Sequence, residues 1–462
     1  MRIFDYLNIS NERSIWADSG FHVQKSVIKE ILKKRNDYHF YLTVPYERLG
    51  DVKQIESDRL TLMPYHYSGG SGHKYHFDTN ELWDLMDMWH KDWDLVLCNE
   101  VILGTHFKNM FCYKSHFDIP IVNYIHWVNT TADITPQQWD MFTSIYWCHR
   151  TYCNSEYGKH LVTKELDGIF KESTSNVIKN RLGVLNVGFD EEELDRYRTK
   201  DKFDKVTLVF NHRISQYTGY DKLLQKCKQI YDGGFKDFQL IFTNPSVSLT
   251  RVNLTKYPFL KVCDEVLSRQ DYIRLLWKSD ICFGLHSGQN QWSIAFLEAL
   301  YCNNIPITTN GIFFNEMLSS KTNTLDDLEY VMQHVSSIKK NYNLKKYYWK
   351  YLATGYIKAF EEAVESYEKS ADWLKKPNES KVLQQVLSIF ETKPIVEKRE
   401  ILSIRAKMTG SGIGAQTPIT KYRRELLKNH CDDMIEKKTS FYKLKDMKKA
   451  KVKPVDYWLK EY

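Results

Sequence analysis

The sequence has no run of about twenty apolar residues, the length that a membrane-spanning helix requires. It also has no CxxC pair, and its nine cysteines, an odd number, favour reduced thiols over a disulfide framework. The opening MRIFDYLNISNER lacks both a long apolar run and a small-residue cleavage site, so it is typical of a first strand rather than of a signal peptide. We therefore expect a cytoplasmic protein without a membrane span.

A chain of 462 residues is too long for one hydrophobic core and suits two domains with an appendage. Its apolar content of 42% and charged content of 27% are ordinary for a globular protein. Short apolar strands alternate with helical stretches such as VQKSVIKEILKK in the amino-terminal half, which predicts a doubly wound parallel sheet. We expect an α/β protein with Rossmann-like domains at 1–190 and 191–375 and, at 376–462, a crossover helix followed by a small, basic, helix-turn-helix-like appendage.

The segment 281–300, ICFGLHSGQNQWSIAFLEAL, predicts a diphosphate site. An apolar strand leads through a polar turn into a helix, and the unpaired N–H groups at the start of such a helix attract phosphate. Glu298 follows about one turn into the helix, where a carboxylate can accept hydrogen bonds from the two hydroxyls of a ribose. The alternative is that Glu298 is an ordinary polar residue of a Rossmann helix.

The segment 206–225, VTLVFNHRISQYTGYDKLLQ, predicts a second strand, loop and helix. Asn211 and Arg213 lie where this strand ends, at the edge of the sheet on which ligands of parallel α/β domains bind. An arginine at this edge can neutralise a diphosphate leaving group through two parallel hydrogen bonds.

These segments together resemble the retaining glycosyltransferases of family 4, which have the GT-B fold. Arg213 and Gly219 match the family's R-L-x-x-x-K-G pattern, with Thr218 in place of Lys, and Glu298 followed by Ala matches the second acid of its E-x7-E signature, with Asn290 in place of the first. Ser155, Gly188 and Asp190 lie in further segments that follow the family's order. The resemblance implies an N-terminal acceptor domain, a C-terminal donor domain and transfer of a sugar with retained configuration. It also makes Asn290, Ser293 and Ile294 candidate contacts of the nucleotide-sugar.

Two sites in the amino-terminal half are further candidates. Ser19 and Gly20 lie in the turn WADSGFH, which we expect between the first strand and its helix, and their N–H groups could approach the donor diphosphate or the acceptor. The alternative is a plain turn with a helix cap. His126 ends the strand IPIVNYIHW, where many members of the family have a histidine that contacts the transferred sugar. The alternative is a core histidine.

The DxD motif Asp92-Trp93-Asp94 closes a helix and starts a strand, so we expect no metal there. The resemblance therefore implies a metal-independent reaction with a nucleotide-sugar, most simply a UDP-sugar. In such a reaction Arg213, Glu298 and His126 are the candidate catalytic residues, and orientation and leaving-group stabilisation replace an enzyme nucleophile.

All of the excess positive charge lies in the tail. Residues 391–462 contain 18 Lys and Arg against 10 Asp and Glu, a net charge of +8, whereas the whole chain has +7. We expect helices at 396–408 and 417–429 and a strand within 440–446, the outline of a winged helix-turn-helix that binds nucleic acid. The second helix would present one basic face, formed by Lys421, Arg423, Arg424 and Lys428. A solvated surface and an anionic membrane surface are the alternatives.

The donor segments and the tail together resemble the phage DNA glycosyltransferases, which act on hydroxymethylated bases, and the FNHR segment is also similar to a tRNA glycosyltransferase. The resemblance implies a DNA-binding, DNA-modifying enzyme of a bacteriophage, active in the host cytoplasm. A polysaccharide or lipopolysaccharide glycosyltransferase, or a nucleic-acid-binding relic that has lost catalysis, are the competing hypotheses.

Overall fold

The structure is a computed structural model that describes residues 1–7, 19–52, 57–65, 93–115, 119–128, 136–243, 256–263, 265–287, 291–309, 313–318, 323–338, 340, 342–371 and four short strands between 395 and 460. The chain divides into two compact units, residues 1–105 with 121–361 and residues 106–120 with 362–462. Two parallel sheets lie in the first unit. No helix in the described part of the chain is both long enough and apolar enough to cross a bilayer.

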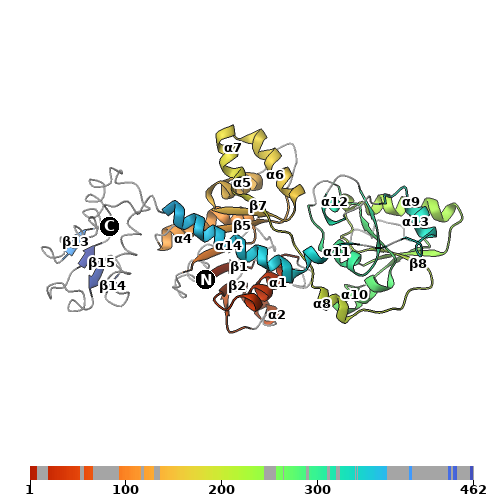
Figure 1. Ribbon diagram of the computed structural model, residues 1–462, viewed down its shortest axis with the longest axis horizontal. Coiled ribbons are helices and arrows are strands. Elements are labelled where there is room, and N and C mark those ends of the chain that lie inside the picture. Colours follow the sequence, from red (N-terminus) through yellow and green to blue (C-terminus); the bar gives the residue numbers. More distant parts are fainter. Residues whose placement is uncertain are drawn as a thin grey trace. The chain divides into compact units, whose positions relative to one another are not determined.

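The first sheet has seven parallel strands in the order β3-β2-β1-β4-β5-β6-β7. Its strands are β1 (Arg2–Tyr6), β2 (His39–Pro45), β3 (Leu60–Tyr65), β4 (Leu95–Cys98), β5 (Ile121–Ile125), β6 (Arg150–Cys153) and β7 (Leu182–Val184). The helices between them are α1 (Ser19–Lys34), α2 (Leu49–Val52), α4 (Gly104–Ser115), α5 (Pro136–Trp147), α6 (Glu156–Ile169) and α7 (Glu172–Lys179). Figure 1 shows α5, α6 and α7 beside β5 and β7, where buried Phe142, Val162 and Ile178 share one core.

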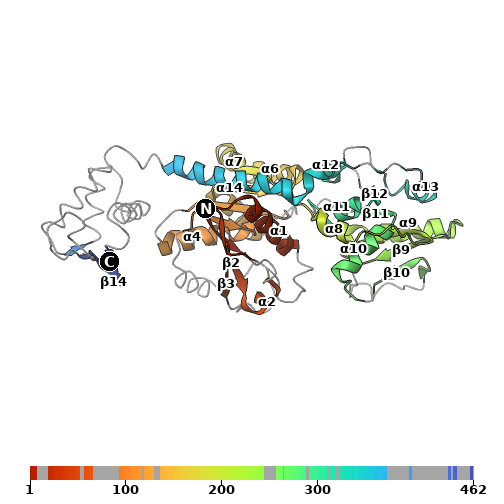
Figure 2. The same ribbon diagram turned by 60° about the horizontal axis from the view of Figure 1, so that its bottom comes forward.

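The second sheet has five parallel strands in the order β10-β9-β8-β11-β12. Its strands are β8 (Val206–Phe210), β9 (Phe238–Phe242), β10 (Leu260–Val262), β11 (Ile281–Gly284) and β12 (Ile305–Thr308). The helices are α8 (Glu191–Arg196), α9 (Tyr220–Asp232), α10 (Arg269–Lys278), α11 (Ile294–Tyr301), α12 (Phe314–Met317) and α13 (Leu328–Gln333), and Figure 2 shows α9, α10 and α11 beside these strands. Strands buried along their whole length, such as β9 and β11, need helices on both faces.

Helix α14 (Trp349–Ala371) follows the second sheet, and its first half lies in the first unit. The chain therefore passes between the two sheets twice, and the two crossings touch: the N–H of Phe189 donates to the carbonyl of Tyr347 at 3.2 Å, and Phe189 pairs with Tyr348 in a parallel bridge. Gly188 permits this approach, because a Cβ added there would lie 2.3 Å from the Tyr347 carbonyl oxygen.

We predict that Gly188→Ala destabilises the chain by about 1–3 kcal/mol, because two backbones must separate to admit one methyl group. Gly168→Ala is the matched control. A Cβ at Gly168, inside α6, meets no described atom within 4 Å, so helix propensity should make this variant about 1 kcal/mol more stable. Thermal unfolding of the two variants checks both signs, and equal midpoints would contradict the tight crossing.

The second unit contains a four-stranded mixed sheet in the order β13-β16-β15-β14. Its strands are β13 (Ile395–Glu397), β14 (Ile435–Lys438), β15 (Phe441–Leu444) and β16 (Trp458–Lys460). Strand β15 confirms the strand expected within 440–446. The helix expected at 396–408 is wrong at its start, because β-branched Ile395 and Val396 pair as part of β13. The basic helix expected at 417–429, with Lys421, Arg423, Arg424 and Lys428, lies outside the described residues.

Candidate donor-nucleotide site

Arg213 lies at the carboxyl end of the second sheet, three residues after β8. Strands β8 and β11 are hydrogen-bonded neighbours, so the loops that follow them meet at the same edge. The Arg213 side chain is exposed and forms no hydrogen bond or ion pair with another described residue. It is therefore a cation that is available to a ligand at this edge.

The loop that carries Arg213 is closed by Thr218 and Gly219. The Thr218 hydroxyl is buried and lies 2.8 Å from the carbonyl oxygen of Arg213. Gly219 has φ of 73°, and a Cβ there would lie 2.7 Å from the carbonyl oxygen of Leu285 at the end of β11. Thr218 thus shapes the loop at the position where the resemblance expects a lysine, and this explains how the loop closes without that charge.

Helix α11 begins at this same edge. Ser293 caps it by accepting a hydrogen bond from the N–H of Phe296 at 3.2 Å, and Ile294 is its first residue. Asn290, the third candidate in this loop, lies outside the described residues. The first N–H groups of α11 carry the positive end of the helix dipole and suit a phosphate.

Glu298 is buried on α11 and forms an ion pair that the sequence analysis missed. Arg269, the first residue of α10, donates to both of its carboxylate oxygens, from Nη1 at 3.1 Å and from Nη2 at 2.5 Å. Arg269 also donates from Nε and Nη2 to Glu193 of α8, at 3.0 and 2.8 Å. A sequence signal existed: a helix dipole disfavours a cation in the first turn, so an arginine there needs a partner elsewhere.

Asn211 links the strand end to this cluster. Its amide nitrogen donates to the Tyr272 hydroxyl at 3.0 Å and to the carbonyl of Ala295 in the first turn of α11 at 2.7 Å. Its Oδ1 is buried and has no hydrogen-bond partner among the described residues. The pKa of Tyr272 is raised well above its usual range, first by burial and then by the charge of Glu298. The structure thus brings Asn211, Ser293, Ile294 and Glu298 together.

Two further buried side chains under this edge were missed. His212 and His286 pack edge to face with ring centroids 4.4 Å apart, and His212 Nε2 lies 2.6 Å from the Phe283 carbonyl oxygen. Burial lowers the pKa of His212 to about 4, and burial together with the neighbouring His212 lowers the pKa of His286 well below its usual value. Both rings are therefore neutral near pH 7 and support the Arg213 loop without adding charge.

In the first sheet, His126 follows β5 directly and is partly exposed. Its Nε2 lies 3.0 Å from Oδ1 of Asn99, which follows β4, and its carbonyl accepts from the Asn154 amide at 2.7 Å. The ring is thus oriented at the carboxyl edge of this sheet. The sequence expectation of a turn at Ser19 and Gly20 is wrong: they are the first two residues of α1, so their N–H groups are those of a helix N-terminus.

Direct hydrogen bonds connect the domain of the first sheet with the domain of the second sheet, some of them from the residues just before α11. Gln291 donates to the carbonyl of Val128 at 3.2 Å, and Trp292 donates to the carbonyl of Val187 at 2.8 Å. Glu316 of α12 accepts from the N–H groups of Glu156 and Tyr157 at the start of α6, at 3.0 and 2.6 Å. The segment just before α11 is therefore anchored to the first sheet's domain.

No protein-family model and no curated protein matches this chain. Solved structures do match it. HepE of Anabaena, in complex with UDP-glucose, aligns with a TM-score of 0.52 at 12% identity over 80% of this chain and 100% of its own. A glycosyltransferase from Rickettsia africae aligns at 0.52 and 11% identity over 81% and 99%. A trehalose-6-phosphate protein of E. coli, bound with UDP-2-fluoro glucose, aligns at 0.53 and 10% identity over 80% and 98%.

The chain has the GT-B fold. This confirms the fold class expected from the sequence, two Rossmann-like domains with an appendage. The assignment of their boundaries to 190 and 375 stays a prediction.

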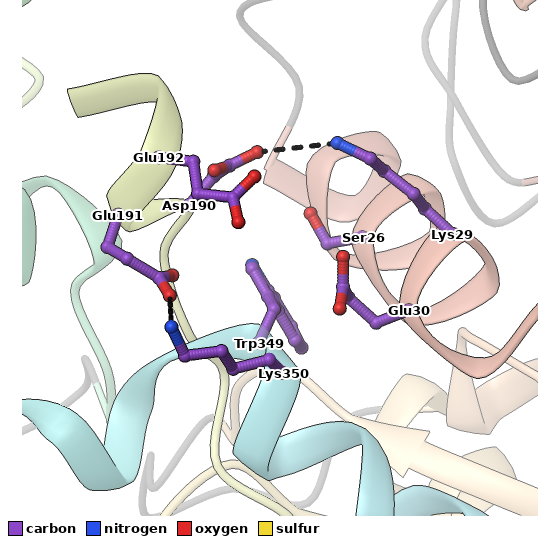
Figure 3. A pocket seen from close by; sticks show the side chains of 8 residues that line it. All are labelled: Ser26, Lys29, Glu30, Asp190, Glu191, Glu192, Trp349 and Lys350. Atoms are coloured by element: carbon purple, nitrogen blue, oxygen red, sulfur yellow. Dashed lines mark ion pairs between the residues drawn. The ribbon is translucent and has the colours of Figure 1, made fainter. Parts of the chain in front are cut away.

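A small pocket of this GT-B chain lies where the two crossings meet (Figure 3) and not at the Arg213 edge. Side chains from α1, α8 and α14 and from the residue before α8 line it: Ser26, Lys29, Glu30, Asp190, Glu191, Glu192, Trp349 and Lys350. Two ion pairs cross it, Lys29 with Asp190 at 3.8 Å and Lys350 with Glu191 at 2.6 Å. Lys29, Asp190, Lys350 and Glu191 are thus paired with each other, so the pocket fits an interface between domains better than a ligand site.

The described residues contain no group of three or more His, Cys, Asp or Glu that could hold a metal ion. Asp94 of the DxD motif accepts from the backbone N–H of Arg2 at 2.7 Å, which ties β4 to β1, and Asp92 lies outside the described residues. Asp94 therefore has a structural role.

Proposed function

We propose that this protein is a retaining glycosyltransferase that uses a UDP-sugar donor. The observation that carries the proposal is the cluster at the carboxyl edge of the second sheet, where exposed Arg213, the start of α11 and the unpartnered Oδ1 of Asn211 lie together. An anionic ligand with hydroxyl groups suits this combination of one cation, helix N–H groups and one acceptor. The UDP-glucose bound to HepE, which shares the fold, supports the choice of nucleotide.

In the proposed reaction the diphosphate leaves while Arg213 and the first N–H groups of α11 stabilise its charge. Glu298 accepts hydrogen bonds from the ribose, and His126 contacts the transferred sugar. The acceptor hydroxyl attacks the face from which the diphosphate departs and gives its proton to the departing diphosphate, so the anomeric configuration is retained. Because the reaction depends on orientation and charge stabilisation, it needs no enzyme nucleophile.

We predict that the reaction proceeds in excess EDTA at the same rate as in buffer, because Arg213 and the α11 amides take the place of a divalent cation. The measurement is release of UDP from UDP-glucose by metal-stripped protein. Loss of activity on chelation, restored by manganese or magnesium, would contradict metal independence and leave the choice of donor untouched.

We further propose that the acceptor is a nucleic acid, with hydroxymethylated bases of phage DNA as the first choice. The support is the net charge of +8 in residues 391–462, because phosphate contacts supply most of the affinity of a protein for DNA. A base inside a duplex must be flipped out to reach an enzyme site, and a basic surface holds the duplex meanwhile. Polysaccharide, lipopolysaccharide and tRNA acceptors, or a non-catalytic nucleic-acid-binding role, are the alternatives.

One experiment separates these possibilities. The full chain is incubated with a panel of labelled nucleotide-sugars and, in separate reactions, with hydroxymethylated DNA, unmodified DNA, tRNA and a bacterial glycan. We expect hydrolysis of a UDP-sugar in every reaction and transfer of label to hydroxymethylated DNA alone. Transfer of label to another acceptor would correct the proposed acceptor and leave the proposed activity in place. If no nucleotide-sugar is turned over, the proposal that the protein is a glycosyltransferase is contradicted.

A further inference from the structure

We propose that Arg269 is a positioning residue that holds the Glu298 carboxylate ready for the two hydroxyls of a ribose, and that this pair makes the site selective for ribonucleotides. The inference rests on the proposed function, because it assumes that a nucleotide binds at Glu298. The sequence analysis did not single out Arg269, which lies 29 positions before Glu298 in the chain, and the pair joins α10 to α11.

The first argument is geometric. Each oxygen of Glu298 receives one N–H from Arg269, so the plane of the carboxylate is fixed relative to the guanidinium. A carboxylate oxygen has two lone pairs, and each oxygen therefore keeps one acceptor position. A carboxylate held in one orientation binds a diol without first losing rotational freedom, which is the usual advantage of preorganisation.

The second argument concerns burial. The Glu298 side chain is 7% exposed, and a buried carboxylate needs a partner to remain charged. Burial by itself would lower the pKa of Arg269, but the charges of Glu298 and Glu193 outweigh it, and the net shift is upward. Arg269 is therefore a permanent cation beside Glu298. Its positive charge lies directly beside the acceptor that would meet the ribose hydroxyls.

The third argument is that Arg269 is itself immobilised. Glu193 holds it from the other side through Nε and Nη2, and its guanidinium carbon lies 5.5 Å from the ring centroid of Tyr272. Tyr272 in turn receives a hydrogen bond from Asn211 at the end of β8. The orientation of Glu298 is thus set by the same contacts that shape the strand end near Arg213, which links ribose recognition to the proposed diphosphate site.

The test compares binding of UDP and of 2′-deoxy-UDP to the full chain by calorimetry. We expect the wild-type chain to bind UDP about tenfold more tightly than 2′-deoxy-UDP, since one charge-assisted hydrogen bond is lost with the hydroxyl. Arg269→Lys keeps the charge but cannot hold both oxygens, so we expect it to lower this preference to about twofold while the affinity for 2′-deoxy-UDP changes by less than about twofold. Arg274→Lys, an exposed position on the same helix, is the matched control and should keep the wild-type preference.

A double-mutant cycle completes the test. Glu298→Gln should remove the preference, and adding Arg269→Lys to Glu298→Gln should change it no further, because the arginine acts only through the carboxylate. Equal weakening of both nucleotides in Arg269→Lys would mean a merely structural role and overturn the inference, as would additive effects in the cycle. A wild-type chain that binds UDP and 2′-deoxy-UDP equally overturns the inference but leaves the donor assignment. A wild-type chain that binds neither nucleotide overturns the proposed function as well.

Discussion

Arg213→Ala is expected to lower kcat/KM for sugar transfer at least about tenfold, with most of the loss in kcat. The substitution removes a charge-assisted contact to the leaving diphosphate, worth roughly 1.5–3 kcal/mol, and this contact strengthens as the bond to the sugar breaks. The measurement is steady-state transfer from UDP-glucose at several donor concentrations. Because the Arg213 side chain is exposed and forms no hydrogen bond or ion pair with a described residue, the fold should be unaffected.

Lys222→Ala is the control for this variant. Lys222 is also exposed and lies on α9, one turn after the Arg213 loop, so its loss changes the local net charge by the same amount. We expect its kcat/KM to stay within about twofold of wild type, since a screened charge at that distance contributes little. If the two variants lose the same activity, Arg213 acts only through its contribution to the local net charge, and the leaving-group role is wrong.

Removing residues 391–462 is expected to abolish transfer to DNA while hydrolysis of UDP-glucose continues. Every donor-site residue named above precedes the cut, and the deleted segment contains all of the excess positive charge. The truncated chain should bind DNA more weakly than the intact chain, and the difference should be largest at low salt, because phosphate contacts contribute most there through counterion release. Filter binding over a range of salt concentrations, beside a hydrolysis assay of the same preparation, measures both effects.

A double substitution is the control for the possibility that the truncated chain does not fold. Arg423→Ala with Arg424→Ala should flatten the slope of log affinity against log salt by about 0.9 for each lost phosphate contact, with unchanged hydrolysis. Unaltered binding and transfer by both the truncated and the double-substituted chains would show that the tail is a solvated surface. The nucleic-acid acceptor would then lose its main support.

The sequence predicted those parts of the fold that depend on local chemistry. Ser155, a residue type that favours helix starts, caps α6 by accepting from the N–H of Gly158 at 2.9 Å. The strands β8 and β11 are apolar runs between polar turns, and both lie where the pattern predicted them. Such features need only neighbouring residues, so they can be read without tertiary structure.

The partners of the candidate site residues could not be predicted in this way. Glu298 and Arg269 are far apart in the chain, and nothing in either segment alone specifies that both helices turn these side chains toward each other. Thr218 was recognised only as a missing lysine, because its role depends on the loop geometry that brings its hydroxyl to the Arg213 carbonyl. Ser19 and Gly20 were placed in a turn, since one sequence does not fix the first residue of a helix.

The central claim is that the carboxyl edge of the second sheet binds a nucleoside diphosphate, and a crystal structure of the full chain with UDP tests it most directly. The account predicts that the diphosphate contacts the Arg213 guanidinium and the first N–H groups of α11, and that the ribose hydroxyls lie within hydrogen-bond distance of the Glu298 carboxylate. UDP bound at the pocket between α1 and α8, or at any place away from Arg213 and α11, would contradict it.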